Sequence, residues 1–133
     1  MVPIFSHAKF GGRSVASLLD EQKKTKITSE VRGYWKYLRD YKGHSVFGIA
    51  KNTFDVVKCI VKNQTLDVPA SVLLDGQYGL SNICIGVPLT INKDGVAQIH
   101  QIKLEENEME LLHKSANVVK NNTSKVLEFL KTN

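Results

Sequence analysis

The sequence predicts an α+β domain, with two helices, an antiparallel three-stranded meander and a long C-terminal helix packed on the sheet. Three observations predict this fold class. Apolar side chains recur at three- and four-residue spacing over residues 28–63. Stretches rich in β-branched residues at 68–74, 82–91 and 96–102 are separated by the turn signals DGQYG and NKDG. A second helical repeat then runs from 105 to 130.

The first two helices are predicted between residues 28 and 63. One runs from about Thr28 to Tyr41, because Thr28 or Ser29 can cap its first turn and Gly43 can end it. The other runs from Ser45 to residue 63, and Ser45 suits its N-cap. Residues 1–19 are expected to be irregular, a short turn of helix leading into an extended stretch, because a proline and a Gly-Gly pair interrupt the pattern.

The three strands are predicted to pair through short turns. The segment from Asn92 to Gly95 suits a hairpin connection, because glycine tolerates positive φ. Pro69 and Pro88 lack the N–H that a strand ladder needs, so we expect them at strand starts, edges or bulges. Acidic residues begin the segment at Glu105 and lysines come after them, which suits the dipole of the last helix.

Composition places the chain among ordinary globular proteins. Its 133 residues are 42% hydrophobic and 23% charged, and no apolar run is long enough to cross a membrane. The opening segment has no basic region and no small-residue cleavage site, so no signal peptide is expected. Cys59 and Cys84 form no CxxC pair and are predicted to be reduced, buried thiols. These features predict a cytoplasmic protein.

Neither nucleic-acid binding nor metal binding is predicted from the residues alone. The net charge is +5, but the lysines are spread along amphipathic segments and accompany no nucleic-acid-binding motif. The chain contains no HExxH, P-loop, GxGxxG or GxSxG motif. Its four histidines share no spacing, and His100 and His113 are expected to be surface or hydrogen-bonded side chains rather than ligands. We therefore expect no metal site.

Four segments together resemble the C-terminal domain of the lactate/malate dehydrogenase family, and most closely its bacterial L-lactate dehydrogenase branch. They are MVPIFSHA, VRGYWKYLRDYKGHSVFGIA, LDGQYGLSNICIGVPLTINKDGVAQIHQIKLEENE and LLHKSANVVK. The first resembles the residues directly after the family's catalytic histidine segment, and the second resembles the two helices that flank the substrate. The third is similar to the family's strand meander, and the fourth to its last helix. The resemblance covers essentially the whole chain.

The resemblance implies a two-domain NAD-dependent enzyme of which residues 1–133 are part of the substrate-side domain. The family's proton-transferring histidine would lie just before Met1, with its aspartate partner and the substrate-gripping arginine further upstream. The nucleotide-binding Rossmann domain would also lie outside this chain. We therefore expect no catalytic residue here, no tight NAD binding and no turnover by the chain alone.

Two positions here match the family's binding residues. Ser45 stands where the family usually has a threonine beside the substrate side chain, and Ile49 matches an apolar residue that covers the nicotinamide ring. From spacing alone, Ser45 is an ordinary N-cap and Ile49 a core residue. Tyr34 and Trp35 depart from the family, which has two small residues there, and their rings would narrow the pocket or push the helix aside. Serine in place of threonine at Ser45 removes a methyl group and works slightly the other way.

The implied substrate is a small 2-oxo or 2-hydroxy acid. Pyruvate/lactate is the first expectation, a branched 2-oxo acid such as that of an L-2-hydroxyisocaproate dehydrogenase the second, and oxaloacetate/malate the third. A homo-oligomer without nucleic-acid or membrane partners is expected. The alternative from another class is a non-enzymatic self-association module, because a domain without its Rossmann partner exposes apolar surface.

Overall fold

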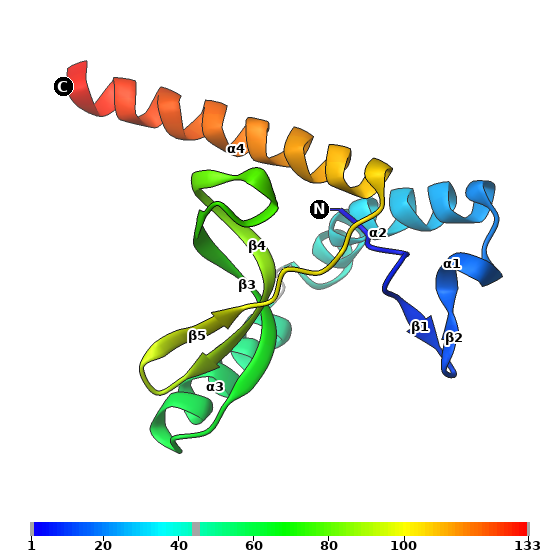
Figure 1. Ribbon diagram of the computed structural model, residues 1–133, viewed down its shortest axis with the longest axis horizontal. Coiled ribbons are helices and arrows are strands. Elements are labelled where there is room, and N and C mark those ends of the chain that lie inside the picture. The colour runs from blue at the N-terminus through cyan, green and yellow to red at the C-terminus, as the bar shows by residue number, and fades with distance from the viewer. Residues whose placement is uncertain (1, 44–45, 133) are drawn as a thin grey trace. The chain divides into compact units, whose positions relative to one another are not determined.

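The computed structural model describes residues 2–43 and 46–132, with two compact units along the chain (Figure 1). The first unit comprises Pro3–Asp55 and the second begins at Val56. The second unit contains the sheet and the last helix, and the elements follow in the predicted α+β order. The predicted fold class is confirmed.

A small hairpin opens the first unit. Strand β1 (Lys9–Phe10) pairs with β2 (Arg13–Ser14), and the single helical turn α1 (Val15–Leu18) comes next. The prediction had the helical turn before the extended stretch, which is the wrong order. Gly11 and Gly12 both have positive φ, 56° and 79°, as a two-residue hairpin turn requires. The Gly-Gly pair is therefore a hairpin signal.

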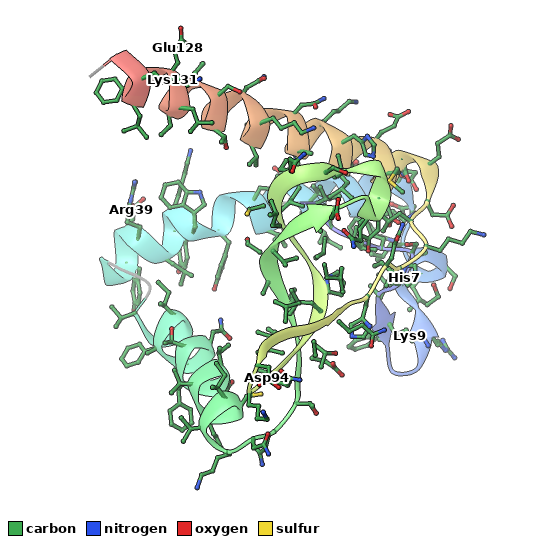
Figure 2. All side chains as sticks on the ribbon, turned by 60° about the vertical axis from the view of Figure 1, so that its left-hand side comes forward. His7, Lys9, Arg39, Asp94, Glu128 and Lys131 are labelled. Carbon is green, nitrogen blue, oxygen red and sulfur yellow. The ribbon has the colours of Figure 1, made fainter. Side chains whose placement is uncertain are left out.

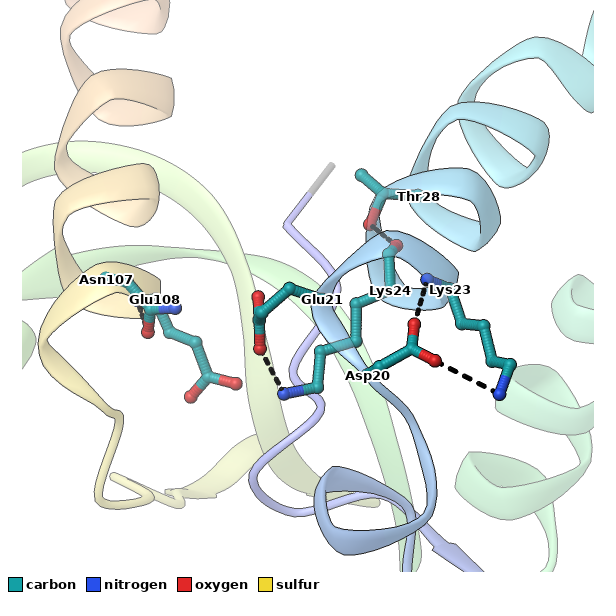
Figure 3. Close-up of polar contacts among 7 residues, drawn as sticks. All are labelled: Asp20, Glu21, Lys23, Lys24, Thr28, Asn107 and Glu108. Atoms are coloured by element: carbon teal, nitrogen blue, oxygen red, sulfur yellow. Dashed lines mark hydrogen bonds and ion pairs between the residues drawn. The ribbon is translucent and has the colours of Figure 1, made fainter.

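Helix α2 (Glu21–Lys42) begins well before the predicted start at Thr28. Asp20 is its N-cap, and the Asp20 carboxylate accepts the Lys23 backbone N–H at 2.8 Å (Figure 3). The Thr28 hydroxyl instead donates to the Lys24 carbonyl oxygen inside the helix, at 2.8 Å. The predicted cap at Thr28 or Ser29 is wrong because Asp20 satisfies the first amides earlier, and the residues after it are good helix formers.

Gly43 ends α2, as predicted. It has φ 75°, and its N–H donates to the Arg39 carbonyl oxygen at 2.8 Å. Helix α3 (Phe47–Val61) lies within the predicted range. Near its end the buried Cys59 thiol donates to the Gln64 carbonyl oxygen at 3.0 Å.

The sheet of the second unit is an antiparallel meander in the order β3-β4-β5. Its strands are β3 (Leu66–Asp75), β4 (Ser81–Asn92) and β5 (Gly95–Ile99). The one-turn 3₁₀ helix η1 (Gln77–Gly79) connects β3 to β4, and the predicted NKDG hairpin connects β4 to β5. Strand β5 ends at Ile99, earlier than the predicted 102.

Alternate residues of β4 point into the core. Ile83, Ile85, Val87 and Leu89 are buried, whereas Cys84 is exposed. The prediction of a buried thiol is therefore confirmed for Cys59 and wrong for Cys84. The physical reason is the two-residue period of a strand, which turns Cys84 to the opposite face from its apolar neighbours.

The two prolines lie opposite each other in the β3–β4 ladder. The His100 N–H donates to the Pro88 carbonyl oxygen at 2.8 Å, so residue 88 directs its backbone polar groups away from β3. The ring nitrogen of its partner Pro69 then lies on the outer-edge side of β3. The lack of an N–H there costs no ladder bond. Pro88 lies inside the central strand, at the place where the pairing with β5 stops.

Tyr78 fastens η1 to the segment that leads into the last helix. Its buried hydroxyl donates to the His100 carbonyl oxygen at 3.2 Å and accepts the Ile102 N–H at 3.0 Å. Its carbonyl oxygen accepts a bond from His113 Nε2 at 2.9 Å. These bonds replace the strand pairing that ends at Ile99 and hold the last helix against the sheet.

Helix α4 (Glu106–Thr132) packs on the sheet through its first half. Glu108 is buried, and its carboxylate accepts the Glu105 N–H at 3.1 Å, the reciprocal bond of a capping box. Leu112 and Ala116 are buried against the core, with Val119 half-buried. Beyond the end of the β3–β4 hairpin the helix runs on without the sheet (Figure 1). None of the helices that the structure describes combines the length and apolar character that a membrane crossing requires.

Candidate functional site

The predicted binding positions fall around the corner between α2 and α3. Ser45, predicted as both N-cap and substrate neighbour, lies outside the described residues, and so does His44. Ile49 lies in the first turns of α3 with 66% of its surface exposed. It is therefore not a core residue of this unit, and its apolar side chain is free to cover a ligand.

Exposed apolar side chains surround Ile49 in the sequence. Val46, just before α3, and Phe47, its first residue, are exposed, as are Tyr34 and Trp35 on α2. A soluble monomer seldom leaves so many large apolar groups in water unless they meet a ligand or another protein surface. The described part of the corner thus has the character of a binding surface, and it includes Ile49.

The large rings on α2 are held by their neighbours. The Arg39 guanidinium lies 5.0 Å from the centre of the Trp35 ring, one helical turn away, and Arg39 is labelled in Figure 2. The Tyr34 and Tyr37 rings have centroids 6.0 Å apart. A cation–π pair at such an exposed site contributes about 0.5–1 kcal/mol. The sequence analysis did not identify Arg39 as a partner of Trp35, although two residues four apart on a helix lie close enough to interact.

The described histidines are engaged in structural bonds. His7 bonds to the Ser6 hydroxyl at 2.9 Å, and His113 donates to the Tyr78 carbonyl oxygen. His100 Nε2 lies 2.7 Å from the Thr90 hydroxyl. The expectation that His100 and His113 are surface or hydrogen-bonded side chains is confirmed, because both are hydrogen-bonded.

The cluster around His100 lacks the arrangement that activates a nucleophile. The Thr90 hydroxyl donates to Asp67 and also bonds to His100, so the hydroxyl lies between the carboxylate and the imidazole. In a nucleophilic triad the histidine lies between the hydroxyl and the carboxylate. The three side chains instead tie β3 and β4 to the segment after β5.

No proton-transfer site emerges from the charged groups of the described residues. Asp20 has a pKa below its ordinary value because its carboxylate accepts the Lys23 backbone N–H, and the Lys23 side chain adds to the effect. That carboxylate is a helix cap. Nowhere in residues 2–43 and 46–132 do three His, Cys, Asp or Glu side chains gather as metal ligands would.

Comparison with known proteins gives a consistent family. The lactate/malate dehydrogenase, alpha/beta C-terminal domain matches residues 1–130. The chain is 35% identical to an L-lactate dehydrogenase of Latilactobacillus sakei, covering 96% of this chain and 41% of that protein. It is 36% identical to an L-lactate dehydrogenase of Lacticaseibacillus casei, covering 89% and 38%.

Solved structures of similar fold include both branches of the family. A malate dehydrogenase from Salinibacter ruber superimposes with a TM-score of 0.87 at 25% identity, covering 98% of this chain and 43% of that one. The minor L-lactate dehydrogenase from Enterococcus mundtii gives 0.86 at 27% identity, covering 94% and 42%. The chain thus spans about two fifths of the length of the proteins it matches.

Proposed function

This chain belongs to the lactate/malate dehydrogenase family, and we propose that it forms the substrate-side part of an NAD-dependent L-lactate dehydrogenase. The observation that carries the proposal is the match of the family's C-terminal domain to residues 1–130. The L. sakei and L. casei relatives, both named L-lactate dehydrogenases, favour lactate over malate.

In this proposal the α2–α3 corner forms one wall of the substrate pocket. Ser45 lies beside the substrate side chain, and Ile49 covers the nicotinamide ring and excludes water. The exposed, apolar Ile49 side chain fits that role, because a nicotinamide face is itself apolar. NAD, when bound, accepts or donates the hydride.

The catalytic groups are proposed to lie outside residues 1–133. The histidines described here are hydrogen-bonded within the fold, and we propose that none of them is the proton-transferring histidine that the family resemblance implies. The nucleotide-binding domain, that histidine and the carboxylate-gripping arginine come from the part that the relatives have in addition. We therefore propose that these residues alone bind NAD weakly and turn over no substrate.

Pyruvate is the proposed substrate because Tyr34 and Trp35 reduce the room for a side chain. Arg39 lies over the Trp35 ring and Tyr37 contacts Tyr34, and these contacts modestly favour the observed positions of both rings. A methyl group fits such a site better than a branched chain or a second carboxylate. A branched 2-oxo acid ranks second and oxaloacetate third.

The substrate proposal is tested by joining this chain to the N-terminal part of the L. sakei enzyme and comparing kcat/KM for pyruvate, 2-oxoisocaproate and oxaloacetate. We expect pyruvate to be preferred, and Trp35→Ala to raise kcat/KM for 2-oxoisocaproate about tenfold relative to pyruvate, within the range for a few methylene groups. Phe10→Ala, an exposed ring on β1 rather than at the α2–α3 corner, is the control. An unchanged substrate ratio in Trp35→Ala contradicts the role given to that ring.

A self-association module is the second candidate, favoured by the many exposed apolar side chains of both units. The whole enzyme is expected to be a homo-oligomer, so self-association is compatible with the dehydrogenase proposal. Sedimentation velocity of the chain alone tests the module, since a monomer at high concentration contradicts it.

The free thiols Cys59 and Cys84 fit the reducing cytoplasm, where we place the enzyme.

A further inference from the structure

Two aspartates of the chain are followed directly by glycine, at Asp75-Gly76 and at Asp94-Gly95. An Asp-Gly bond can isomerise without an enzyme, because the glycine backbone nitrogen can attack the side-chain carbon of the aspartate and close a succinimide ring. Glycine favours the attack, since it has no side chain to obstruct the ring. The two dipeptides are chemically identical, so any difference in their reactivity must come from the fold.

The reaction consumes nothing but the water that it first releases. The bond between the Gly95 nitrogen and Asp94 Cγ forms while the carboxyl group loses its hydroxyl and the nitrogen loses its hydrogen, and these leave together as water. Water then opens the ring at either carbonyl. Opening at the side-chain carbonyl restores aspartate. Opening at the main-chain carbonyl gives isoaspartate, in which the main chain runs through Cβ and Cγ and the α-carboxylate is free.

Solvent access does not separate the two aspartates. Asp75 and Asp94 are both exposed. The Asp94 carboxylate lies 2.9 Å from Lys93 Nζ, and 71% of its side chain is exposed. An ion pair at such an exposed place contributes little, so it does not keep the carboxyl group from reacting. The two bonds differ instead in how firmly the glycine nitrogen is held.

The Gly76 nitrogen lies in a closed turn against the core. Its N–H donates to the Leu80 carbonyl oxygen at 2.9 Å, and Gln77 Oε1 accepts the Asp75 N–H at 2.8 Å. Leu80 and Tyr78, in the same turn, are buried and belong to the core cluster that α4 covers. The Gly76 nitrogen can therefore be freed only when these side chains loosen from the core.

The Gly95 nitrogen lies at the other end of β4, in the turn that leads to β5 (Figure 1), where Figure 2 labels Asp94. Gly95 pairs with Asn92 in the last rung of the ladder, and a register shift after Thr90 separates the last two rungs from the others. The buried core cluster includes none of residues 90–98, all of which the structure describes. The turn can therefore open while the core stays closed, because few buried contacts hold it.

We propose that Asp94 is a site of spontaneous isoaspartate formation in the folded chain, whereas the η1 turn protects Asp75. The additional main-chain methylene falls in the β4–β5 turn, and the new α-carboxylate is exposed there. A carboxyl methyltransferase that recognises isoaspartate is the partner that such a site fits. The proposal needs only the folded chain and does not depend on the dehydrogenase function.

Peptide mapping of the aged chain tests the proposal. The chain is incubated near neutral pH, folded in buffer and unfolded in urea, and isoaspartate is quantified at both positions by electron-transfer fragmentation. Methylation by isoaspartyl methyltransferase gives an independent total. In urea we expect similar rates at the two positions. In buffer we expect isoaspartate to form at least about tenfold faster at Asp94 than at Asp75, because the β4–β5 turn opens more readily.

Matched variants assign the signal. Asp94→Glu should remove most of the methylation of the folded chain, because glutamate closes the corresponding larger ring far more slowly, whereas Asp75→Glu should leave it unchanged. Tyr78→Phe removes the bonds of the Tyr78 hydroxyl that hold η1. It should raise isoaspartate at Asp75 several-fold and leave Asp94 unaffected.

Three results overturn the proposal. The first is an equal or greater rate at Asp75 than at Asp94 in the folded chain. The second is a ratio in buffer that equals the ratio in urea, because the local sequence rather than the fold would then set the rates. The third is the absence of isoaspartate at Asp94 in the folded chain while the unfolded chain accumulates it.

Discussion

The two halves of α4 have the same apolar spacing but different surroundings. In the first half the seam lies against the sheet, and Ala116 is fully buried. In the second half the seam faces water, and Leu127 is exposed. The difference shows that periodicity identifies the face that a helix will bury, whereas the extent of the neighbouring layer decides how much of that face is buried.

The largest effect is expected from truncating the anchored half. Leu112→Ala removes a buried side chain from the core and should lower the free energy of unfolding by about 2–5 kcal/mol. Leu127→Ala in the exposed half should change it by less than about 0.5 kcal/mol. Urea unfolding followed by circular dichroism measures both, and equal losses would abolish the distinction between the halves.

The second-largest loss of unfolding free energy is expected from removing the Tyr78 hydroxyl, which holds the first half of α4 against the sheet. Tyr78→Phe removes the hydroxyl that bonds to the His100 carbonyl oxygen and the Ile102 N–H. Leaving those groups unpaired should cost about 1–3 kcal/mol. Tyr37→Phe, on an exposed ring, is the control and should be neutral. If Tyr78→Phe unfolds at the same urea concentration as the parent chain, the hydroxyl does not fasten α4.

A smaller effect is expected at the start of α4. Glu108→Ala loses the bond to the Glu105 N–H and should lower the free energy of unfolding by about 1 kcal/mol. Glu110→Ala, an exposed neighbour, serves as the comparison. If Glu110→Ala loses more unfolding free energy than Glu108→Ala, the negative charge of the first turns rather than the cap stabilises the helix.

The smallest effect is expected at the exposed N-cap of α2, in contrast to the buried capping residue of α4. The pKa of Asp20 is lower in the folded chain than in the unfolded one, so its contribution is present above the ordinary aspartate pKa of about 3.9 and is lost as the pH falls through the folded value. The protection factor of the Lys23 amide, which is corrected for the intrinsic pH dependence of exchange, should therefore fall in acid, and Asp20→Asn should remove that dependence. A fall of the protection factor that persists in Asp20→Asn would refute the assignment.

The sequence predicted the helices from α2 on and the strands of the meander, and it predicted their limits less well. It did not predict the hairpin of β1 and β2. Local signals were sufficient at Gly43 and in the NKDG turn, because backbone conformation decides those ends. They failed at Asp20, where a cap further upstream replaced the predicted one, and at Ile99, where the Tyr78 hydroxyl takes over from the strand ladder. Such a tertiary bond between distant segments leaves no periodic pattern to detect.

The candidate site was predictable only through the family resemblance. No spacing rule separates the ligand-covering role that we propose for Ile49 from the role of a core residue, and its exposure on α3 became evident from the structure. Cys84 was misplaced because an apolar run does not reveal which of its residues faces outward. The role of Ser45 stays a prediction, since it lies outside the described residues.

Pyruvate-dependent oxidation of NADH tests whether this chain is the substrate-side part of an L-lactate dehydrogenase. The assay compares the purified chain with the same chain joined to the N-terminal part of the L. sakei enzyme. We expect no turnover by the chain alone and turnover by the joined protein. Turnover by the chain alone, or a folded joined protein that reduces none of the three 2-oxo acids, would contradict it.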